Sequence, residues 1–108
     1  MNPELLTILR CPVTRSTLRL EVIEKAGNGS IQKGILYAEQ DWFYPIIDQV
    51  PRLLVEAFLD HSDFFQQHMP QYADKAKRLQ QVHSDLINLV IKKKQAHKSK
   101  LLARMENI

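Results

Sequence analysis

Residues 42–54 read WFYPIIDQVPRLL, and this stretch decides which fold the chain can form. Its first half is aromatic and β-branched, a composition typical of a β-strand. Pro45 and Pro51 cannot donate a backbone hydrogen bond, so we expect their segments to lie at an edge or a bend of a sheet. The stretch therefore predicts an edge strand whose free backbone groups are available to a partner.

Two further strands are predicted upstream. Residues 31–37 are again rich in β-branched and aromatic side chains, and the polar residues 39–41 suit a turn before the next strand. Residues 18–23 alternate with the period of two that places one face of a strand on a core. Residues 25–30 hold two of the three glycines and tolerate positive φ angles, which predicts a chain reversal. The expected result is a small antiparallel sheet of about three strands.

The N-terminal residues predict a short helix that leads into a cysteine-containing loop. Asn2 can cap a helix whose first turn holds Pro3, and apolar residues follow at positions 5, 6, 8 and 9. The loop reads LRCPVTRSTL over residues 9–18. It looks like half of a zinc knuckle, in which a Cys-Pro-x-Cys turn supplies two thiolates, but Thr14 stands in place of the second cysteine.

Neither a metal site nor a catalytic residue is predicted. His61, His68, His83 and His97 lack the spacing of three or four that would place two imidazoles on one helix face. Cys11 is interpreted as a small buried side chain, because a lone free cysteine is more often that than a nucleophile. We therefore expect no bound metal, no cofactor and no catalysis by this chain.

From residue 55 onward the pattern becomes helical. Apolar residues recur at spacings of three and four over residues 72–91, which predicts one amphipathic helix. Its seam at Leu79, Val82, Leu86 and Leu89 is heptad-like but lasts barely two heptads. Residues 92–100, KKKQAHKSK, lose this periodicity and predict a solvated, fraying end. The helix has three alternatives: it folds back on the sheet, pairs with itself in a homodimer, or docks in the groove of a partner.

The composition is that of a folded protein with one domain and an extension. Of 108 residues, 44% are hydrophobic and 25% are charged. No stretch approaches the roughly 18 consecutive apolar residues of a membrane span, no signal peptide is recognised, and one cysteine cannot form an internal disulfide. We therefore expect no membrane association and a cytoplasmic location. The β domain is expected over residues 1–56 and the helical extension over residues 57–108.

Charge is distributed unevenly along the chain. Residues 1–70 hold six Lys or Arg and nine Asp or Glu, whereas residues 71–108 hold nine and three. The basic run includes Lys92, Lys93, Lys94, Lys98 and Lys100. These lysines are weak candidates for nucleic-acid contact, such as indirect contact with tRNA or rRNA through a partner. No aromatic residues are interleaved with them, so the pattern does not support sequence-specific reading of RNA.

Two motifs carry a resemblance to a known family. LLTILRCPVTRSTL over residues 5–18, followed by WFYPIIDQVPRLL, resembles the tRNA methyltransferase activator family in its small bacterial members. The resemblance covers about half of the chain and implies an α+β fold: a zinc-ribbon-like antiparallel sheet, here without metal, and a short N-terminal helix. It implies a non-catalytic adaptor that binds and stabilises an S-adenosylmethionine-dependent methyltransferase acting on tRNA, rRNA or protein. Similar domains also occur fused in front of methyltransferases.

The resemblance also implies which residues matter. In the family, the segment that matches residues 43–54 lies along the methyltransferase. The partner-binding candidates are therefore Tyr44, Ile46, Ile47, Val50, Pro51 and Leu53. Gln49 stands where the family usually has glycine, so a positive φ angle there would be strained. Packing must replace the lost metal, and the aromatic candidates for this role are Tyr37, Trp42, Phe43 and Tyr44.

The function expected from the sequence is that of a methyltransferase adaptor. One alternative is a basic RNA-binding accessory protein that uses the lysine run. Another is a self-associating helical module with a vestigial β domain.

Overall fold

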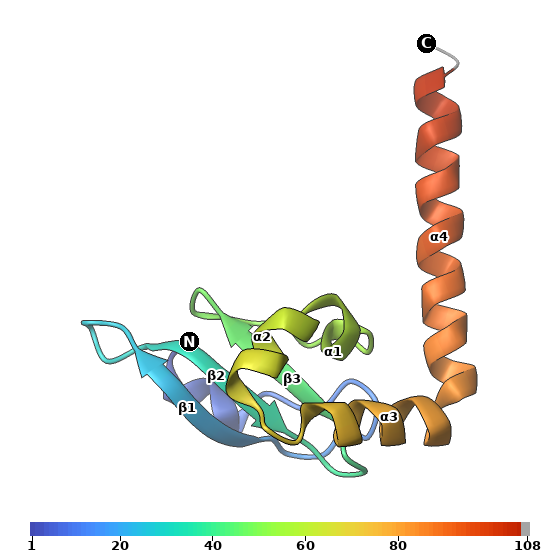
Figure 1. Ribbon diagram of the computed structural model, residues 1–108. Helices are drawn as coiled ribbons and strands as arrows, with labels where there is room; N and C mark the ends of the chain where they lie inside the picture. The colour runs from blue at the N-terminus through green and yellow to red at the C-terminus, as the bar shows by residue number, and fades with distance from the viewer. Residues whose placement is uncertain (107–108) are drawn as a thin grey trace.

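The protein has an α+β fold built on one four-stranded antiparallel sheet (Figure 1). The computed structural model describes the backbone of residues 1–106 and the side chains of residues 1–96. The strands are β1 (Arg19–Lys25), β2 (Ile31–Tyr37), β3 (Phe43–Ile47) and β4 (Val50–Pro51), in the spatial order β1-β2-β3-β4. The predicted fold class and antiparallel sheet are thus confirmed. The prediction missed β4, because two residues are too few to show a period.

Tight turns with unusual backbone angles connect the last three strands. Gln40 and Asp41, between β2 and β3, have φ angles of 59° and 66°. Asp48 and Gln49, between β3 and β4, have φ angles of 50° and 69°. Two successive positive φ angles are the pattern of a type I′ hairpin turn, whose twist matches that of the flanking strands. Gln49 therefore keeps the left-handed conformation that glycine adopts without cost.

The predicted edge position of Pro45 is wrong, because β3 is an interior strand between β2 and β4. The Arg52 N–H donates to the Pro45 carbonyl over 2.9 Å. In an antiparallel strand the N–H and C=O of one residue point to the same side. The missing donor of Pro45 therefore faces Arg52 and costs the ladder between β2 and β3 nothing.

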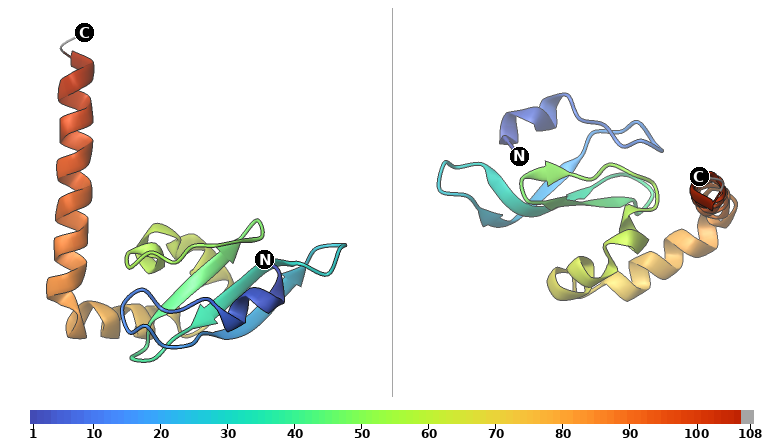
Figure 2. Two further views of the ribbon diagram at one scale, coloured as in Figure 1. Left: turned by 180° about the vertical axis from the view of Figure 1, so that it is seen from behind. Right: turned by 90° about the horizontal axis from the view of Figure 1, so that it is seen from above.

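Residues 1–106 form five helices. They are the 3-10 helix η1 (Pro3–Thr7) and the α-helices α1 (Ala57–Asp60), α2 (Ser62–His68), α3 (Tyr72–Val82) and α4 (Ser84–Glu106). The predicted N-terminal helix is confirmed with its cap, since the Asn2 side chain accepts a hydrogen bond from the Glu4 N–H over 3.0 Å. Figure 2 shows the N-terminal segment on one side of the sheet and α1–α3 on the other.

Alternating residues of β3 supply the two faces of the core. Phe43 points toward the helices, where its ring lies 6.0 Å from Phe58, 4.8 Å from Phe65 and 6.1 Å from Tyr72. Tyr44 points to the opposite face and contacts Cys11. One hydrophobic cluster holds these residues together with Leu79 of α3 and Ile87 of α4. The core is therefore continuous across residue 56, where the sequence predicts a boundary.

The predicted helix over residues 72–91 is two helices that meet at His83. His83 has φ −116° and ψ 29°, outside the helical range, and its ring lies 4.8 Å from that of the buried Trp42. Residues 92–100, which the sequence predicts as a solvated, fraying end, lie within α4, which continues to Glu106. Lysine, glutamine and alanine are good helix formers even without apolar periodicity. Figure 1 shows the C-terminal half of α4 standing clear of the other elements.

Candidate partner-binding groove

The cysteine loop keeps a knuckle shape through hydrogen bonds. The Arg15 N–H donates to the Cys11 carbonyl over 2.9 Å, and the Cys11 N–H donates to the Ser16 carbonyl over 3.0 Å. The Thr14 N–H points at the Cys11 sulfur from 3.4 Å, while the Thr14 hydroxyl lies 2.8 Å from that of Ser16. Thr14 therefore closes the turn with its own hydrogen bonds.

Cys11 and Tyr44 form a buried polar pair beneath this loop. The Sγ and hydroxyl oxygen lie 3.0 Å apart, and Cys11 is only 1% exposed. Burial favours the neutral thiol, but hydrogen bonds from Thr14, Tyr44 and the Val13 backbone outweigh it and lower the pKa of Cys11. Burial and the contact with Cys11 raise the pKa of Tyr44. Because reagents and substrates cannot reach the sulfur, its geometry supports a structural role.

Of the four aromatic residues expected to replace the metal, Tyr44 has its hydroxyl within hydrogen-bond distance of Cys11. Trp42 and Phe43 are buried toward the helices. Tyr37 lies farther out, where its hydroxyl donates to Glu21 over 2.7 Å and Lys75 Nζ lies 4.6 Å from its ring centroid. Among the described residues, no group of three or more His, Cys, Asp or Glu side chains is placed to hold a metal ion.

Two of the six predicted partner-binding residues are corrected by the structure. Tyr44 and Ile46 are fully buried, so neither side chain can contact a partner. They lie on an interior strand, where alternate side chains fill the core beneath the N-terminal segment. The sequence pattern could not reveal this, because aromatic and β-branched residues are equally typical of a core strand and of an interface.

The other four predicted residues lie in or just after the β3–β4 hairpin. Val50 is 47% exposed, whereas Ile47, Pro51 and Leu53 are half-buried. Prediction overlooked the neighbouring Leu54, which is 55% exposed. The hairpin thus presents apolar side chains to solvent at the true edge of the sheet.

Backbone pairing at this edge is limited by Pro51. Arg52 donates inward to Pro45, so alternation along β4 directs the backbone of Pro51 outward. Pro51 offers a carbonyl there but no N–H, so this edge lacks a donor that an added strand would need for full pairing. A partner at β4 must therefore gain most of its affinity from side chains, contrary to the backbone-led pairing that the sequence suggested.

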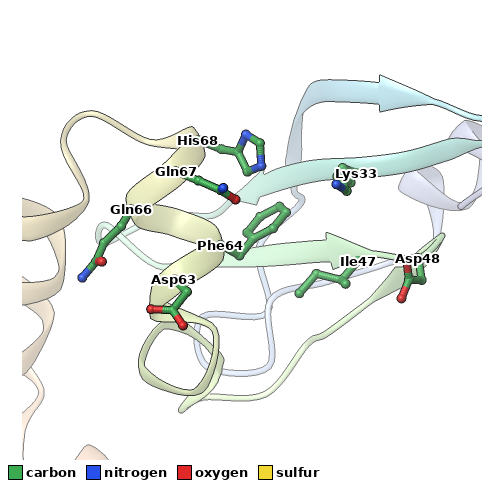
Figure 3. A pocket seen from close by; sticks show the side chains of 8 residues that line it. All are labelled: Lys33, Ile47, Asp48, Asp63, Phe64, Gln66, Gln67 and His68. Atoms are coloured by element: carbon green, nitrogen blue, oxygen red, sulfur yellow. The ribbon is translucent and has the colours of Figure 1, made fainter.

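A groove runs beside the hairpin on the helix side of the sheet. Its volume is about 630 Å³, and Figure 3 shows Phe64 and His68 of α2 reaching across the sheet near Lys33 and Ile47. Val50 pairs with Ile47, so both side chains lie on this same face. The groove is lined by Lys33, Ile47, Asp48, Asp63, Phe64, Gln66, Gln67 and His68.

The groove has an apolar centre and charged rims. Phe64 and Ile47 supply the apolar part, and the His68 ring packs 4.9 Å from that of Phe64. Lys33 Nζ lies 3.8 Å from Glu24, which offsets its charge. Among the described residues, Asp48 and Asp63 form no ion pair. No local pattern indicates that Phe64 joins this surface, because residues 64 and 47 meet only through the fold.

The basic run of α4 is divided by its contacts. Lys92 and Lys93 are exposed. Lys94 instead forms ion pairs within the chain, because its Nζ lies 2.6 Å from Asp60 and 3.8 Å from Glu56. The hydrogen bond to Asp60 raises the pKa of Lys94. Lys98 and Lys100 lie outside the residues whose side chains the structure describes.

Comparison with known proteins leaves the family open. No protein-family model matches the chain, and no curated protein matches it. Within residues 1–106, no helix combines the length and apolar character needed to cross a bilayer.

Proposed function

We propose that this protein is a non-catalytic adaptor that binds and stabilises an S-adenosylmethionine-dependent methyltransferase in the cytoplasm. The motifs at residues 5–18 and 42–54, which resemble the tRNA methyltransferase activator family, suggest this class of partner. The observation that carries the proposal is the exposure of Val50 and Leu54 on the hairpin of the second motif. The methyltransferase would act on tRNA, rRNA or protein.

The surface explains how binding would stabilise the partner. Fully burying a valine or leucine side chain contributes about 1.5–3 kcal/mol, so the exposed parts of Val50 and Leu54 are worth a fraction of that each. The half-buried Pro51 and Leu53 add further apolar area. A partner that exposes a matching apolar strip is stabilised, because this protein binds the folded state of the partner and not its unfolded state.

The test is recovery of the partner from cells that make this protein naturally. The tagged chain should retain a methyltransferase identified by mass spectrometry, and Val50→Asp and Leu54→Asp should each release it. Val22→Asp is the matched control, since Val22 is 42% exposed on β1 at the opposite edge of the same sheet. The proposal fails if no methyltransferase is recovered, or if Val22→Asp releases it and the hairpin variants do not.

A second step separates stabilisation from mere contact. The recovered methyltransferase should be purified alone and with this protein, and its melting temperature and rate of methyl transfer measured. An adaptor should raise both, and Leu54→Asp should abolish the increase. A complex that leaves both quantities unchanged would contradict a stabilising role.

RNA binding is the second candidate, favoured by the exposed pair Lys92 and Lys93. Phosphate contacts of this kind weaken steeply as salt rises. Lys92→Glu/Lys93→Glu should then remove a salt-dependent affinity for tRNA that Val50→Asp leaves intact. Absence of such affinity at low salt would eliminate this candidate.

A further inference from the structure

Helix α4 presents a face that its own chain leaves largely uncovered. Helix α4 is held to the rest of the molecule by Ile87 in the hydrophobic core, by Leu86 and Ile91 packed against that core, and by Lys94 on Asp60. Leu89, Val90 and Lys93 occupy another face, with Leu89 and Lys93 at the spacing i, i+4. Leu89 is 50% exposed and Lys93 is exposed.

This face matches the way a helix docks in a groove. Side chains on one face of a helix form a strip, which an apolar groove can accept. Here the strip is apolar at the base of α4 and becomes cationic at Lys92 and Lys93. An occupant must therefore combine apolar surface with negative charge.

The groove beside the β3–β4 hairpin has the complementary composition. Ile47 and Phe64 form its apolar centre, and Asp48 and Asp63 stand at its rim. Among the described residues, neither these two carboxylates nor Lys92 and Lys93 form an ion pair. Lys33 is the opposing charge in the groove, and Glu24 lies 3.8 Å from it.

We infer that α4 of one molecule docks in this groove of a second copy, with Leu89 and Val90 on Ile47 and Phe64, and Lys92 and Lys93 facing Asp48 and Asp63. The helix cannot reach the groove of its own chain while Ile87, Ile91 and Lys94 keep it against α1 and the core. When α4 of each copy docks in the groove of the other, the two contacts form a closed dimer with two-fold symmetry.

Two parallel copies of α4 alone would pack less well. Direct parallel pairing brings Lys93 of each helix against Lys93 of the other, and like charges at such a contact oppose association. Docking in the groove places the lysines beside carboxylates instead. The inference is independent of the methyltransferase proposal, because it concerns the purified chain alone.

The first test is sedimentation equilibrium of the purified full chain from about 1 to 300 μM, a range that reports dissociation constants in the micromolar region. We expect a mass that rises from 12.6 kDa toward twice that value. Leu89→Asp should weaken the dimer by at least about tenfold, as expected for a central apolar anchor. Leu54→Asp, which lies outside the docking surface, should leave the dimer intact.

Reversing the charges on α4 and in the groove tests whether the groove is the docking site. Lys92→Glu/Lys93→Glu and Asp48→Asn/Asp63→Lys should each weaken self-association, because each places like charges together or removes opposite ones. An equimolar mixture of the two variants restores opposite charges at one of the two contacts and keeps the native charges at the other, so it should form a dimer again. Circular dichroism and thermal melting confirm that each variant is folded.

Three outcomes would overturn the inference. The first is a monomer at every concentration. The second is a dimer that Leu89→Asp disrupts but the groove variant does not, which would indicate pairing of α4 with α4. The third is failure of the mixed charge variants to associate. Recovery or loss of a methyltransferase has no bearing on any of these measurements.

Discussion

At the scale of single residues, Cys11 and Tyr44 show what a knuckle loop retains without its second cysteine. Their polar atoms lie 3.0 Å apart in a buried site, where a lost partner leaves an unsatisfied group. The loop above them is closed by hydrogen bonds of Thr14 and Ser16. A thiol in this position contributes to stability and has no access to reactants.

Removing the thiol should destabilise the fold. Cys11→Ala leaves the Tyr44 hydroxyl with no partner in the core, and the expected cost is about 1–3 kcal/mol in the free energy of unfolding. Cys11→Ser should recover part of this loss, because its hydroxyl can still form a hydrogen bond. Chemical denaturation measures both variants. A thiol reagent should modify Cys11 only at the rate of unfolding, and rapid reaction with the folded protein would contradict its burial.

The second residue-scale prediction concerns Gln49. Left-handed backbone costs a residue other than glycine roughly 1–2 kcal/mol, while glycine loses more entropy on folding. Gln49→Gly should therefore raise the free energy of unfolding by about 0.5–1 kcal/mol. The measurement is again chemical denaturation, and a loss of stability would show that the φ angle of 69° is not strained.

Gly34 provides the contrasting control. A Cβ there would lie 2.9 Å from the Glu21 carbonyl oxygen and 3.3 Å from Ile31 Cγ2. Backbone cannot move aside as a flexible side chain does, so Gly34→Ala should destabilise the protein by about 1–3 kcal/mol. We expect Gln49→Gly to raise the free energy of unfolding and Gly34→Ala to lower it. This difference would show that backbone strain limits stability at residue 49 and close packing at residue 34.

At the scale of elements, α4 combines two parts with different environments. Its base joins the core through Ile87, which is 3% exposed, and Lys94 ties it to α1. Beyond that point the helix stands clear of the other elements (Figure 1). An isolated helix shorter than about 12–15 residues is marginal in water, so the outer part gains stability from any partner that covers it.

Substitutions on the two faces of α4 should therefore change the free energy of unfolding by different amounts. Ile87→Ala should lower the free energy of unfolding by about 2–4 kcal/mol, because it opens a cavity in the shared core. Leu89→Ala, two residues away on the uncovered face, should cost less than about 1 kcal/mol in the monomer. Denaturation at low protein concentration measures both. Equal effects would show that the two faces are covered alike.

At the scale of the whole molecule, burial of tyrosines couples stability to high pH. Burial and the hydrogen bond to Glu21 raise the pKa of Tyr37 to about 12. Burial, with a contribution from Cys11, also raises the pKa of Tyr44, and burial raises that of Tyr72. All three tyrosines of the chain thus favour the neutral phenol in the folded state.

The direction of the pH dependence follows from the linkage between tyrosine ionisation and folding. A raised folded-state pKa stabilises the protein fully below the unfolded value of 10.0, and for Tyr37 this stabilisation is lost as pH rises through about 12. The protein should therefore lose stability progressively above pH 10, and ultraviolet absorbance should show tyrosinate appearing together with unfolding. Tyr37→Phe should weaken this dependence. Ionisation of all three tyrosines near pH 10 in a folded protein would contradict the prediction.

The sequence by itself determined the elements with strong local signals. Residues 31–37 and 43–47 became strands because aromatic and β-branched side chains fit a pleated, buried surface, and Asn2 capped η1 because its side chain can accept from a nearby N–H. Such signals arise within a few residues. The α+β class follows from them.

Only the tertiary structure decided which strand is the edge and which side chains meet. The Arg52 N–H donates to the Pro45 carbonyl, so β3 is an interior strand. Tyr44 and Ile46 are buried, whereas Val50 and Leu54 are exposed. Packing of the Trp42 ring against His83 accompanies the break between α3 and α4 that periodicity missed. Phe64 and Ile47 line one groove although 17 positions separate them. The physical reason is that burial depends on neighbours distant in sequence, which local patterns do not contain.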